Sequence, residues 1–268
     1  MDFPIDYSQI SLFMKCPMLW RYRYLMGLDL GVHPSASWSK HLIHKPLEKW
    51  WLGEDWDWDQ LWDRYVTERR GIVDPFYTLD LARAGITGWL KKFSGDRENY
   101  ELISTEKVVP VPQVPGFVTK PDLVLRRKRD GRVFVKDFKT SRYEKEALLF
   151  DRQFLGQVLG YNANGFSRDF FLLKNTKKDG VVVEVTRDEE EVSGDLLDEW
   201  AKEAMMVMAM MEMTVATGVF PKNAPDSCFP FPRIKCEMVD YCAMGGLREV
   251  ALEGFPKKDP LGYLKGEE

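Results

Sequence analysis

The chain has 268 residues, of which 44% are hydrophobic and 30% charged, and its formal net charge at pH 7 is −4. This length suits one large domain, or one domain with an appended module, and the apolar fraction is sufficient for a packed core. No apolar run approaches the roughly 20 residues that a membrane-spanning helix needs. The first residues lack the basic and apolar regions of a signal peptide, so we expect a cytoplasmic protein with no membrane partner. The slight negative charge argues against a broadly basic surface but leaves a local nucleic-acid site open.

The first part of the chain is predicted to be helical. One helix is expected from Tyr7 to Gly27, with a break at Cys16-Pro17, and two more are expected at Ser37 to Trp51 and Leu79 to Phe93. A tryptophan-rich stretch lies between the last two, comprising Trp50, Trp51, Trp56, Trp58 and Trp62. Its rings could stack on unpaired bases, but we interpret them as part of the core.

The second part of the chain alternates between strands and helices. The apolar runs and the turns between them predict three strands, a helix, two strands and a long helix, at 102–111, 117–125, 133–138, 147–164, 170–173, 181–185 and 189–216. Six methionines crowd the long helix between Met205 and Met213, and we interpret them as a buried face rather than a binding groove. The remainder is rich in Pro, Gly and Cys, so we expect little regular structure there.

Two neighbouring predicted strands carry charged residues at their ends. Asp122 begins one strand, and Asp137 and Lys139 end the next. The turn between them contains Asp130-Gly131, a strong hairpin signal, so both carboxylates and the lysine should meet at one end of the hairpin. Carboxylates bind Mg²⁺ or Mn²⁺, and such an ion lowers the pKa of a water and neutralises a phosphate. The lysine could orient that water or stabilise the transition state. A solvated strand end would give the same pattern.

The order of these features resembles the PD-(D/E)XK nuclease superfamily, and more narrowly its RecB-like branch, which includes AddB-type and CRISPR-associated RecB-like iron–sulfur exonucleases. The resemblance covers most of the chain. Its parts are an N-terminal helix ending in Cys-Pro, a histidine helix, the Pro-Asp strand, the Asp-x-Lys strand, a Gln-x-x-x-Tyr helix and C-terminal cysteines.

The resemblance implies an α/β, restriction-endonuclease-like fold. Its mixed sheet would be flanked by helices, with a helical iron–sulfur module built from both termini. It also implies an N-terminal helix at 1–36 that contributes to a cysteine clasp, a nuclease core at 37–217 with a helical insertion at about 52–98, and a cysteine-bearing segment at 218–268.

The resemblance further implies a metal site. His44, preceded by an apolar residue on its helix, would bind the ion together with Asp122, Asp137 and the carbonyl of Phe138. His41 follows a lysine and does not fit the pattern. The ion would be Mg²⁺ or Mn²⁺.

The implied catalytic set contains Lys139, Asp122, Asp137, Gln157 and Tyr161. Gln157 and Tyr161 are four residues apart and therefore share one helix face. The amide would orient the lysine or the scissile phosphate, and the ring would stack on a base. Gln153 competes with Gln157 for this role, and Glu106 is a weaker acidic candidate in the preceding strand. The alternative for the helix is an amphipathic surface with incidental polar residues.

The chain has four cysteines: Cys16, Cys228, Cys236 and Cys242. Four thiolates are the ligand set of a [4Fe–4S] cluster or of a tetrahedral Zn²⁺ ion. One lies near the N-terminus and three near the C-terminus, which resembles the clasp of the iron–sulfur nucleases. The resemblance favours a structural [4Fe–4S] cluster over Zn²⁺. Scattered reduced thiols remain an alternative, and a disulfide is not expected in the cytosol.

These features together predict a Mg²⁺- or Mn²⁺-dependent deoxyribonuclease. We expect an exonuclease that acts on DNA ends or single-stranded DNA, with recombination or CRISPR-type proteins as candidate partners. The alternative is a non-catalytic DNA-binding or adaptor protein that keeps the nuclease fold. The presence of every predicted site residue favours the enzyme, because a degenerate relative would be expected to lose some of them.

Overall fold

The structure is a computed structural model that describes residues 3–30, 34–142, 152–176, 180–222, 228, 236, 238–244 and 251–265. The chain forms two compact units, and each unit combines segments that are distant in sequence. The first unit comprises Met1–Gly31, Pro110–Val118 and Asp198–Glu268, and the second comprises Val32–Val109 and Thr119–Leu197. The division at 36/37 and 217/218 stays a prediction.

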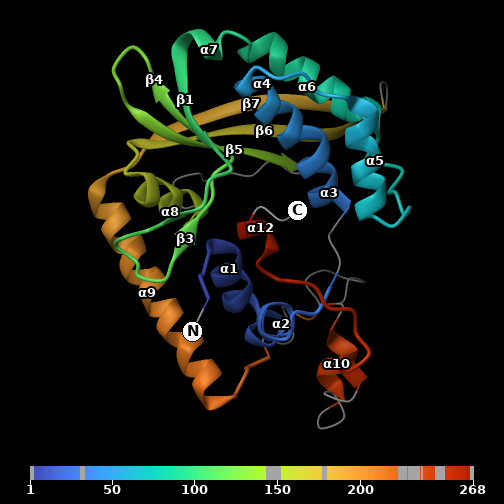
Figure 1. Cartoon of the computed structure of the whole chain (residues 1–268), viewed down its shortest axis with the longest axis vertical. Coiled ribbons are helices and arrows are strands. Elements are labelled where there is room, and N and C mark those ends of the chain that lie inside the picture. The colour runs from blue at the N-terminus through green and yellow to red at the C-terminus, as the bar shows by residue number, and fades with distance from the viewer. Residues whose placement is uncertain are drawn as a thin grey trace. The chain divides into compact units, whose positions relative to one another are not determined.

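A five-stranded mixed sheet forms the centre of the second unit (Figure 1). Its strands lie in the order β1 (Tyr100–Thr105), β4 (Leu123–Arg127), β5 (Val133–Ser141), β6 (Gly165–Thr176) and β7 (Gly180–Glu191). β5 and β6 are parallel, whereas the other neighbouring pairs are antiparallel. The predicted α/β fold with a mixed sheet is therefore confirmed.

The last two strands of the sheet are longer than predicted. β6 and β7 pair over their whole length, from Gly165 opposite Glu191 to Thr176 opposite Gly180. A Cβ atom at Gly165 would lie 2.1 Å from the carbonyl oxygen of Glu190, so only glycine permits this close approach. The predicted start of the long helix at residue 189 is wrong, because Glu189 to Glu191 belong to β7.

Four helices cover one face of the sheet (Figure 1). They are α3 (Pro34–Ser39), α4 (Lys45–Leu52), α5 (Trp58–Glu68) and α6 (Leu79–Phe93), with the π-turn η2 (Lys40–His44) between α3 and α4. The bounds of α6 are those predicted, whereas α5 lies within the predicted helical insertion at about 52–98 but had no predicted bounds. The tryptophans belong to this core, as interpreted: Trp51 is buried, and Trp50, Trp56, Trp58 and Trp62 pack against it.

Helix α8 (Arg152–Tyr161) covers the other face of the sheet. Its Phe154 and Val158 pack with Val135 of β5, and the rings of Phe154 and Phe166 stack at 4.5 Å. The predicted helix at 147–164 is confirmed from residue 152 to residue 161 and ends three residues earlier than predicted, while its earlier part lies outside the described residues. Because side chains alternate along a strand, Asp137 shares the face of Val135, and its neighbour in sequence Lys136 lies on the opposite face.

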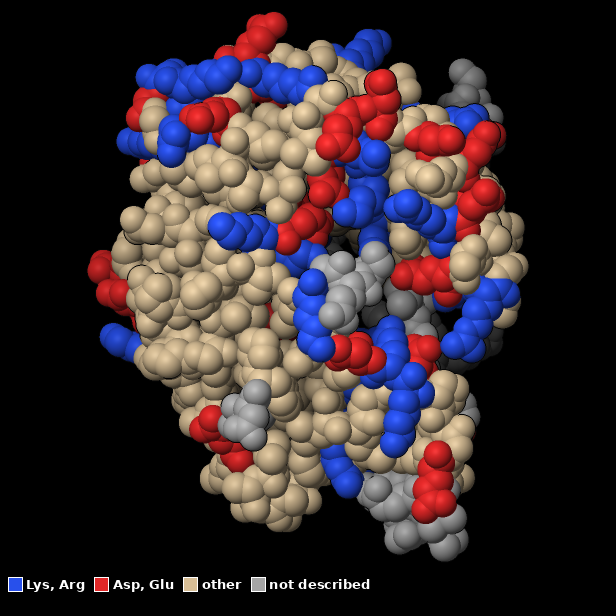
Figure 2. All heavy atoms as spheres, viewed as in Figure 1, with Lys and Arg blue, Asp and Glu red and all other residues tan. Residues whose placement is uncertain are grey.

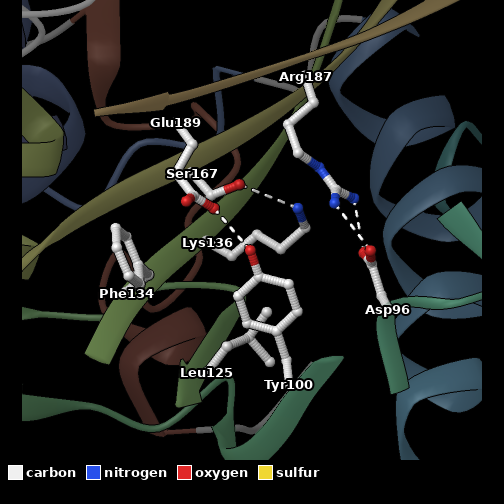
Figure 3. Close-up of a pocket in the computed structure, with 8 residues that line it drawn as sticks. All are labelled: Asp96, Tyr100, Leu125, Phe134, Lys136, Ser167, Arg187 and Glu189. Carbon is white, nitrogen blue, oxygen red and sulfur yellow. Dashed lines mark hydrogen bonds and ion pairs between the residues drawn. The ribbon is translucent and has the colours of Figure 1, made fainter. Parts of the chain in front are cut away.

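A buried ion network joins the sheet to α6 and to the short helix α7 (Asp96–Asn99). Lys136 Nζ lies 2.7 Å from Asp169 Oδ1, and the two side chains are 1% and 0% exposed. Arg187 binds Asp169 and also binds Asp96 at 2.9 and 2.7 Å. The indole N–H of Trp89 donates to Asp169 at 2.5 Å. Figure 3 shows Lys136, Arg187 and Asp96 around the small pocket that they line.

The first unit begins with helices α1 (Tyr7–Lys15) and α2 (Pro17–Trp20) and the π-turn η1 (Arg21–Leu25). The helix predicted at 7–27 is therefore helical but interrupted at Cys16, where the following proline cannot donate a backbone hydrogen bond.

The two ends of the chain meet in the first unit at Asp6. This residue caps α1 by accepting the backbone N–H of Gln9 at 2.9 Å. Tyr263, on the C-terminal helix α12 (Gly262–Lys265), donates to its other oxygen at 2.6 Å.

Helix α9 (Gly194–Thr217) is the longest helix described in the chain. Its buried stripe includes Trp200, which packs edge-on against Phe117 with ring centroids 5.3 Å apart. The interpretation of the methionines as a buried face is wrong for four of them, because Met205, Met206, Met210 and Met213 are exposed. In the described part of the chain, no helix is long and apolar enough to cross a membrane.

Two predicted strands are each split into two pieces. The strand predicted at 102–111 becomes β1 and β2 (Val109–Pro110), and the strand predicted at 117–125 becomes β3 (Val118–Thr119) and β4. β2 and β3 pair with each other in a separate two-stranded ladder. Glu106 and Asp122 lie in the gaps, and both belong to the second unit.

Candidate metal site and catalytic residues

Asp122 lies at the end of the β4–β5 hairpin that the sequence predicted. The next residue, Leu123, pairs with Lys136 of β5. Asp122 Oδ2 accepts the backbone N–H of Phe138 at 2.7 Å, which ties the carboxylate to the neighbouring strand. Its Oδ1 lies 3.1 Å from Nδ1 of His44. The hairpin therefore brings Asp122 to β5 and to the histidine helix at once.

His44 is the last residue of the π-turn η2. Its ring packs edge-on against Phe138, with ring centroids 5.8 Å apart. Burial alone would lower the pKa of His44, but the carboxylates of Asp122 and Asp137 raise it above its usual value. The local potential thus favours a positive charge at this ring. His41 instead lies 3.3 Å from Glu68 Oε2.

Glu106 joins His44 and Asp122 from the gap after β1. Its φ is 47°, a left-handed conformation that few non-glycine residues adopt, and its N–H donates to the carbonyl of Asp122 at 3.0 Å. One ligand atom from each of these three residues lies within 4.8 Å of the others. Among the described residues, no other group of three or more His, Cys, Asp or Glu side chains meets this criterion. Lys120 Nζ contacts the Glu106 carboxylate at 2.6 Å.

Glu106 lies closer to the candidate metal site than its expected place as a weaker acidic candidate suggests. An acid in a predicted strand is usually exposed to solvent, and residues 102–111 read as one continuous strand. The useful signal was its place in the strand next to the Asp122 strand, at the end that carries Asp122.

Asp137 and Lys139 lie beside this group on β5. Asp137 is 3% exposed, and both residues act electrostatically on His44. The ammonium of Lys139 contacts Asp137 Oδ2 and donates to Gln153 Oε1 at 3.0 Å. The Lys139 side chain is 31% exposed, so solvent reaches it. The lysine is therefore held between β5 and α8 at an accessible position.

The structure gives Gln157 and Tyr161 different surroundings from those predicted. Gln157 is 1% exposed, and its Oε1 accepts no hydrogen bond from the described residues. The hydroxyl of Tyr161 donates to the carbonyl of Lys107 at 2.8 Å, next to Glu106. Burial raises the pKa of Tyr161. Gln153, the competing candidate, is the glutamine that contacts Lys139.

The arginines that end β4, just before the turn to β5, are paired with acids. Arg126 lies 2.9 Å from Glu101, and Arg127 binds Asp130 at 2.7 Å and Glu189 at 2.9 Å. Figure 2 shows the same intermixing on the face that it draws, where Lys and Arg alternate with Asp and Glu. This turn does not by itself mark a nucleic-acid surface.

The four cysteines lie in the first unit, although they come from both ends of the chain. Cys16 follows α1, Cys242 lies in α10 (Val239–Ala243), and the backbone N–H of Cys236 donates to the carbonyl of Cys228 at 2.7 Å. Burial raises the pKa of Cys228 and of Cys236, and each is raised further by the other nearby cysteines. The thiols are therefore neighbours in space, and a bound metal would be needed to hold them as thiolates.

Comparison with known proteins identifies the family of this chain. A model of the PD-(D/E)XK nuclease superfamily matches residues 5–243. A putative exonuclease from Eubacterium rectale has 12% identity and a TM-score of 0.46, with 91% of this chain and 93% of that chain covered. An alkaline exonuclease (LHK-Exo) from Laribacter hongkongensis, in complex with dAMP, has 14% identity and a TM-score of 0.34, with 68% and 89% covered. The search of curated proteins gives no match. Because the family match spans most of the sequence, the chain belongs to the PD-(D/E)XK nuclease superfamily.

Proposed function

We propose that the protein is a metal-dependent DNA nuclease. The observation that carries the proposal is the convergence of His44, Glu106 and Asp122, whose ligand atoms lie within 4.8 Å of one another in a chain of this superfamily. Asp137 and Lys139 lie beside them and supply a further carboxylate and a cation.

The donor atoms fit Mg²⁺ or Mn²⁺. Such ions bind oxygen at about 2.1 Å, so two ligand atoms of one ion lie at most about 4.2 Å apart, and the 3.1 Å between His44 Nδ1 and Asp122 Oδ1 is within that limit. The imidazole of His44 favours Mn²⁺, since Mg²⁺ prefers oxygen. Asp137 and the carbonyl of Phe138 are the remaining proposed ligands. When bound, the ion would supply Lewis acidity toward a phosphodiester and lower the pKa of a water.

Lys139 is the proposed catalytic residue that acts through charge. Its ammonium is fixed by Asp137 on one side and by Gln153 on the other. It would stabilise the negative charge that develops on the phosphate and orient the attacking water. The roles predicted for Gln157 and Tyr161 stay part of the proposal.

The finer substrate assignment rests on the sequence resemblance. We infer an exonuclease of the RecB-like branch that acts on DNA ends or single-stranded DNA in the cytoplasm, with recombination or CRISPR-type proteins as candidate partners. The alternative remains a DNA-binding or adaptor protein without catalysis.

A structural [4Fe–4S] cluster on the four cysteines is the second part of the proposal. The four thiols are neighbours in space and come from both ends of the chain. Four thiolates can hold either a cluster, in which each sulfur binds a different iron atom, or a tetrahedral Zn²⁺. The sequence resemblance favours the cluster, with Zn²⁺ as the alternative.

The test of the nuclease is cleavage of end-labelled single- and double-stranded DNA with Mg²⁺, with Mn²⁺ or with a chelator. We expect metal-dependent cleavage, lowered about 10²-fold or more by Asp137→Ala, with DNA binding retained. Asp188→Asn is the matched control, since this acid pairs with Arg168 and is 40% exposed. Mononucleotide release would support an exonuclease. Wild-type protein that binds DNA but cleaves none of these substrates would favour the adaptor.

A further inference from the structure

The helix that carries His44 contains a π-turn immediately before the metal site. In η2 the backbone N–H of Lys45 donates to the carbonyl of Lys40, five residues earlier, instead of four. The residues on both sides have helical dihedral angles, so the helix runs through the turn. A single wide turn of this kind is most often found at a functional site.

Pro46 gives a physical cause for the wide turn. In a regular α-helix, residue 46 would donate to the carbonyl of Leu42, but proline has no N–H and its ring collides with that carbonyl. A turn closed by an i to i−5 hydrogen bond moves the carbonyl away from the ring. Pro46 is buried within the helix, in contrast to Pro34, which begins the same helical segment and displaces nothing.

The apolar pattern of the helix changes phase at the same place. Trp38 and Leu42 form the buried stripe up to the middle of the turn, and Ile43, Leu47 and Trp51 continue it from there. Each residue of an α-helix turns by about 100°, so the extra residue rotates everything after the turn with respect to everything before it. A regular helix could not keep both stripes in the core and also direct the next residue, His44, toward Asp122.

Glu68 of α5 contacts the residues at the start of the π-turn. Its carboxylate accepts the hydroxyl of Ser37, lies 3.6 Å from Lys40 Nζ, and lies 3.3 Å from His41 Nε2. These three partners lie at the end of α3 and in the first half of η2, ahead of His44 in the chain. The Glu68 carboxylate thus fixes the position of the helical segment that leads to His44.

We propose that Pro46 and Glu68 are positioning residues, which maintain the π-turn that delivers His44 to Asp122. This inference rests on the proposed metal site. Its distinctive consequence is that Pro46→Ala lowers metal affinity without lowering stability, because alanine is the better helix former and permits a regular turn.

The experiment measures Mn²⁺ binding to the full chain by calorimetry, coordinated imidazole nitrogen by electron spin echo modulation, and Tm by circular dichroism. Wild-type protein should show the nitrogen signal, and His44→Ala should lose it. Pro46→Ala and Glu68→Gln should each bind Mn²⁺ about tenfold or more weakly, the usual scale for losing a residue that orients a ligand. Pro34→Ala is the control and should bind as wild type does.

The outcomes separate the inference from the proposed function. If His44→Ala leaves the affinity and the nitrogen signal unchanged, His44 is not a ligand, and both proposals are overturned. If His44→Ala loses the signal but Pro46→Ala keeps full affinity, the metal site stands and the positioning role is wrong. A fall in the Tm of Pro46→Ala by several degrees, with affinity unchanged, would also contradict the proposed role.

Discussion

Two lysines on β5, three residues apart, should respond to the same substitution in opposite ways. Lys136 lies on the face toward α6, with its ammonium 2.7 Å from Asp169 and only 1% of its side chain exposed. Lys139 lies on the α8 side, 31% exposed and in contact with Asp137. We expect Lys136→Met to lower stability and Lys139→Met to lower cleavage.

The magnitude for Lys136 follows from its network. Lys136 and Arg187 balance Asp169 and Asp96, so removal of one cation leaves one buried negative charge uncompensated. Breaking a buried pair costs about 3–5 kcal/mol. Asp169 keeps the contacts of Arg187 and Trp89, so we expect the lower end, about 3 kcal/mol. At roughly 2–4 °C per kcal/mol, the Tm of this unit should fall by about 6–12 °C.

For Lys139→Met, we expect the main effect on the rate of DNA cleavage. Loss of a positioned charge at the reacting phosphate lowers turnover by about 10²-fold or more. Its ion pair is open to solvent on the lysine side, although Asp137 is buried, so the free energy of unfolding should fall by less than the roughly 3–5 kcal/mol expected for a fully buried pair.

Urea denaturation and cleavage of end-labelled DNA with Mn²⁺ measure the two effects on the same preparations. Cleavage is expressed per folded molecule, so that the instability of Lys136→Met does not count as lost activity. The reasoning is refuted if folded Lys136→Met fails to cleave, or if Lys139→Met cleaves at nearly the wild-type rate.

Three further predictions concern the metal site, the cysteines and pH. Glu106→Gln should weaken Mn²⁺ binding about tenfold or more in calorimetry, whereas Glu101→Gln, in the preceding strand β1 and paired with Arg126, should not. Cys16→Ser should lower Tm and metal content together, and elemental analysis showing zinc without iron in anaerobically purified wild-type protein would contradict the [4Fe–4S] assignment. Hydrogen bonds from His41 and Ser37 lower the pKa of Glu68 from 4.5 to about 2. Its stabilisation is therefore complete above pH 4.5 and lost as pH falls toward 2, so the stability difference between wild type and Glu68→Gln should shrink from pH 7 to pH 3 in urea titrations.

The parts of the fold that sequence predicts best are those set by local periodicity. Helix α6 has its predicted bounds because apolar residues recur at helical spacing between clear end signals. The β4–β5 hairpin follows from two apolar runs around Asp130-Gly131, and it brings Asp122 to Phe138. These two elements also fix the side of the sheet on which Asp137 and Lys139 lie.

The parts that sequence misses depend on contacts between distant segments. The outer ends of β6 and β7 lack the apolar alternation that identifies a strand, and they form because each strand pairs with the other along its length. The exposure of the α9 methionines could not be predicted for the same reason, because composition does not show which face of the helix is covered by other segments. Gln153 and Gln157 are four residues apart on one helix face, so the pattern cannot say which reaches Lys139.

The site itself is built where regular structure stops. A regular helix or strand repeats its side-chain directions at a fixed period, so it cannot by itself turn three ligands toward one point. Here each of the three converging residues, which are proposed ligands, comes from an interruption: His44 ends a π-turn, Glu106 takes a left-handed conformation after β1, and Asp122 occupies the gap before β4. Two of the interruptions split strands that the sequence predicts to be continuous. These three residues come together because they depart from regular helix or strand geometry. Sequence periodicity cannot predict such departures, so it fails at the proposed site.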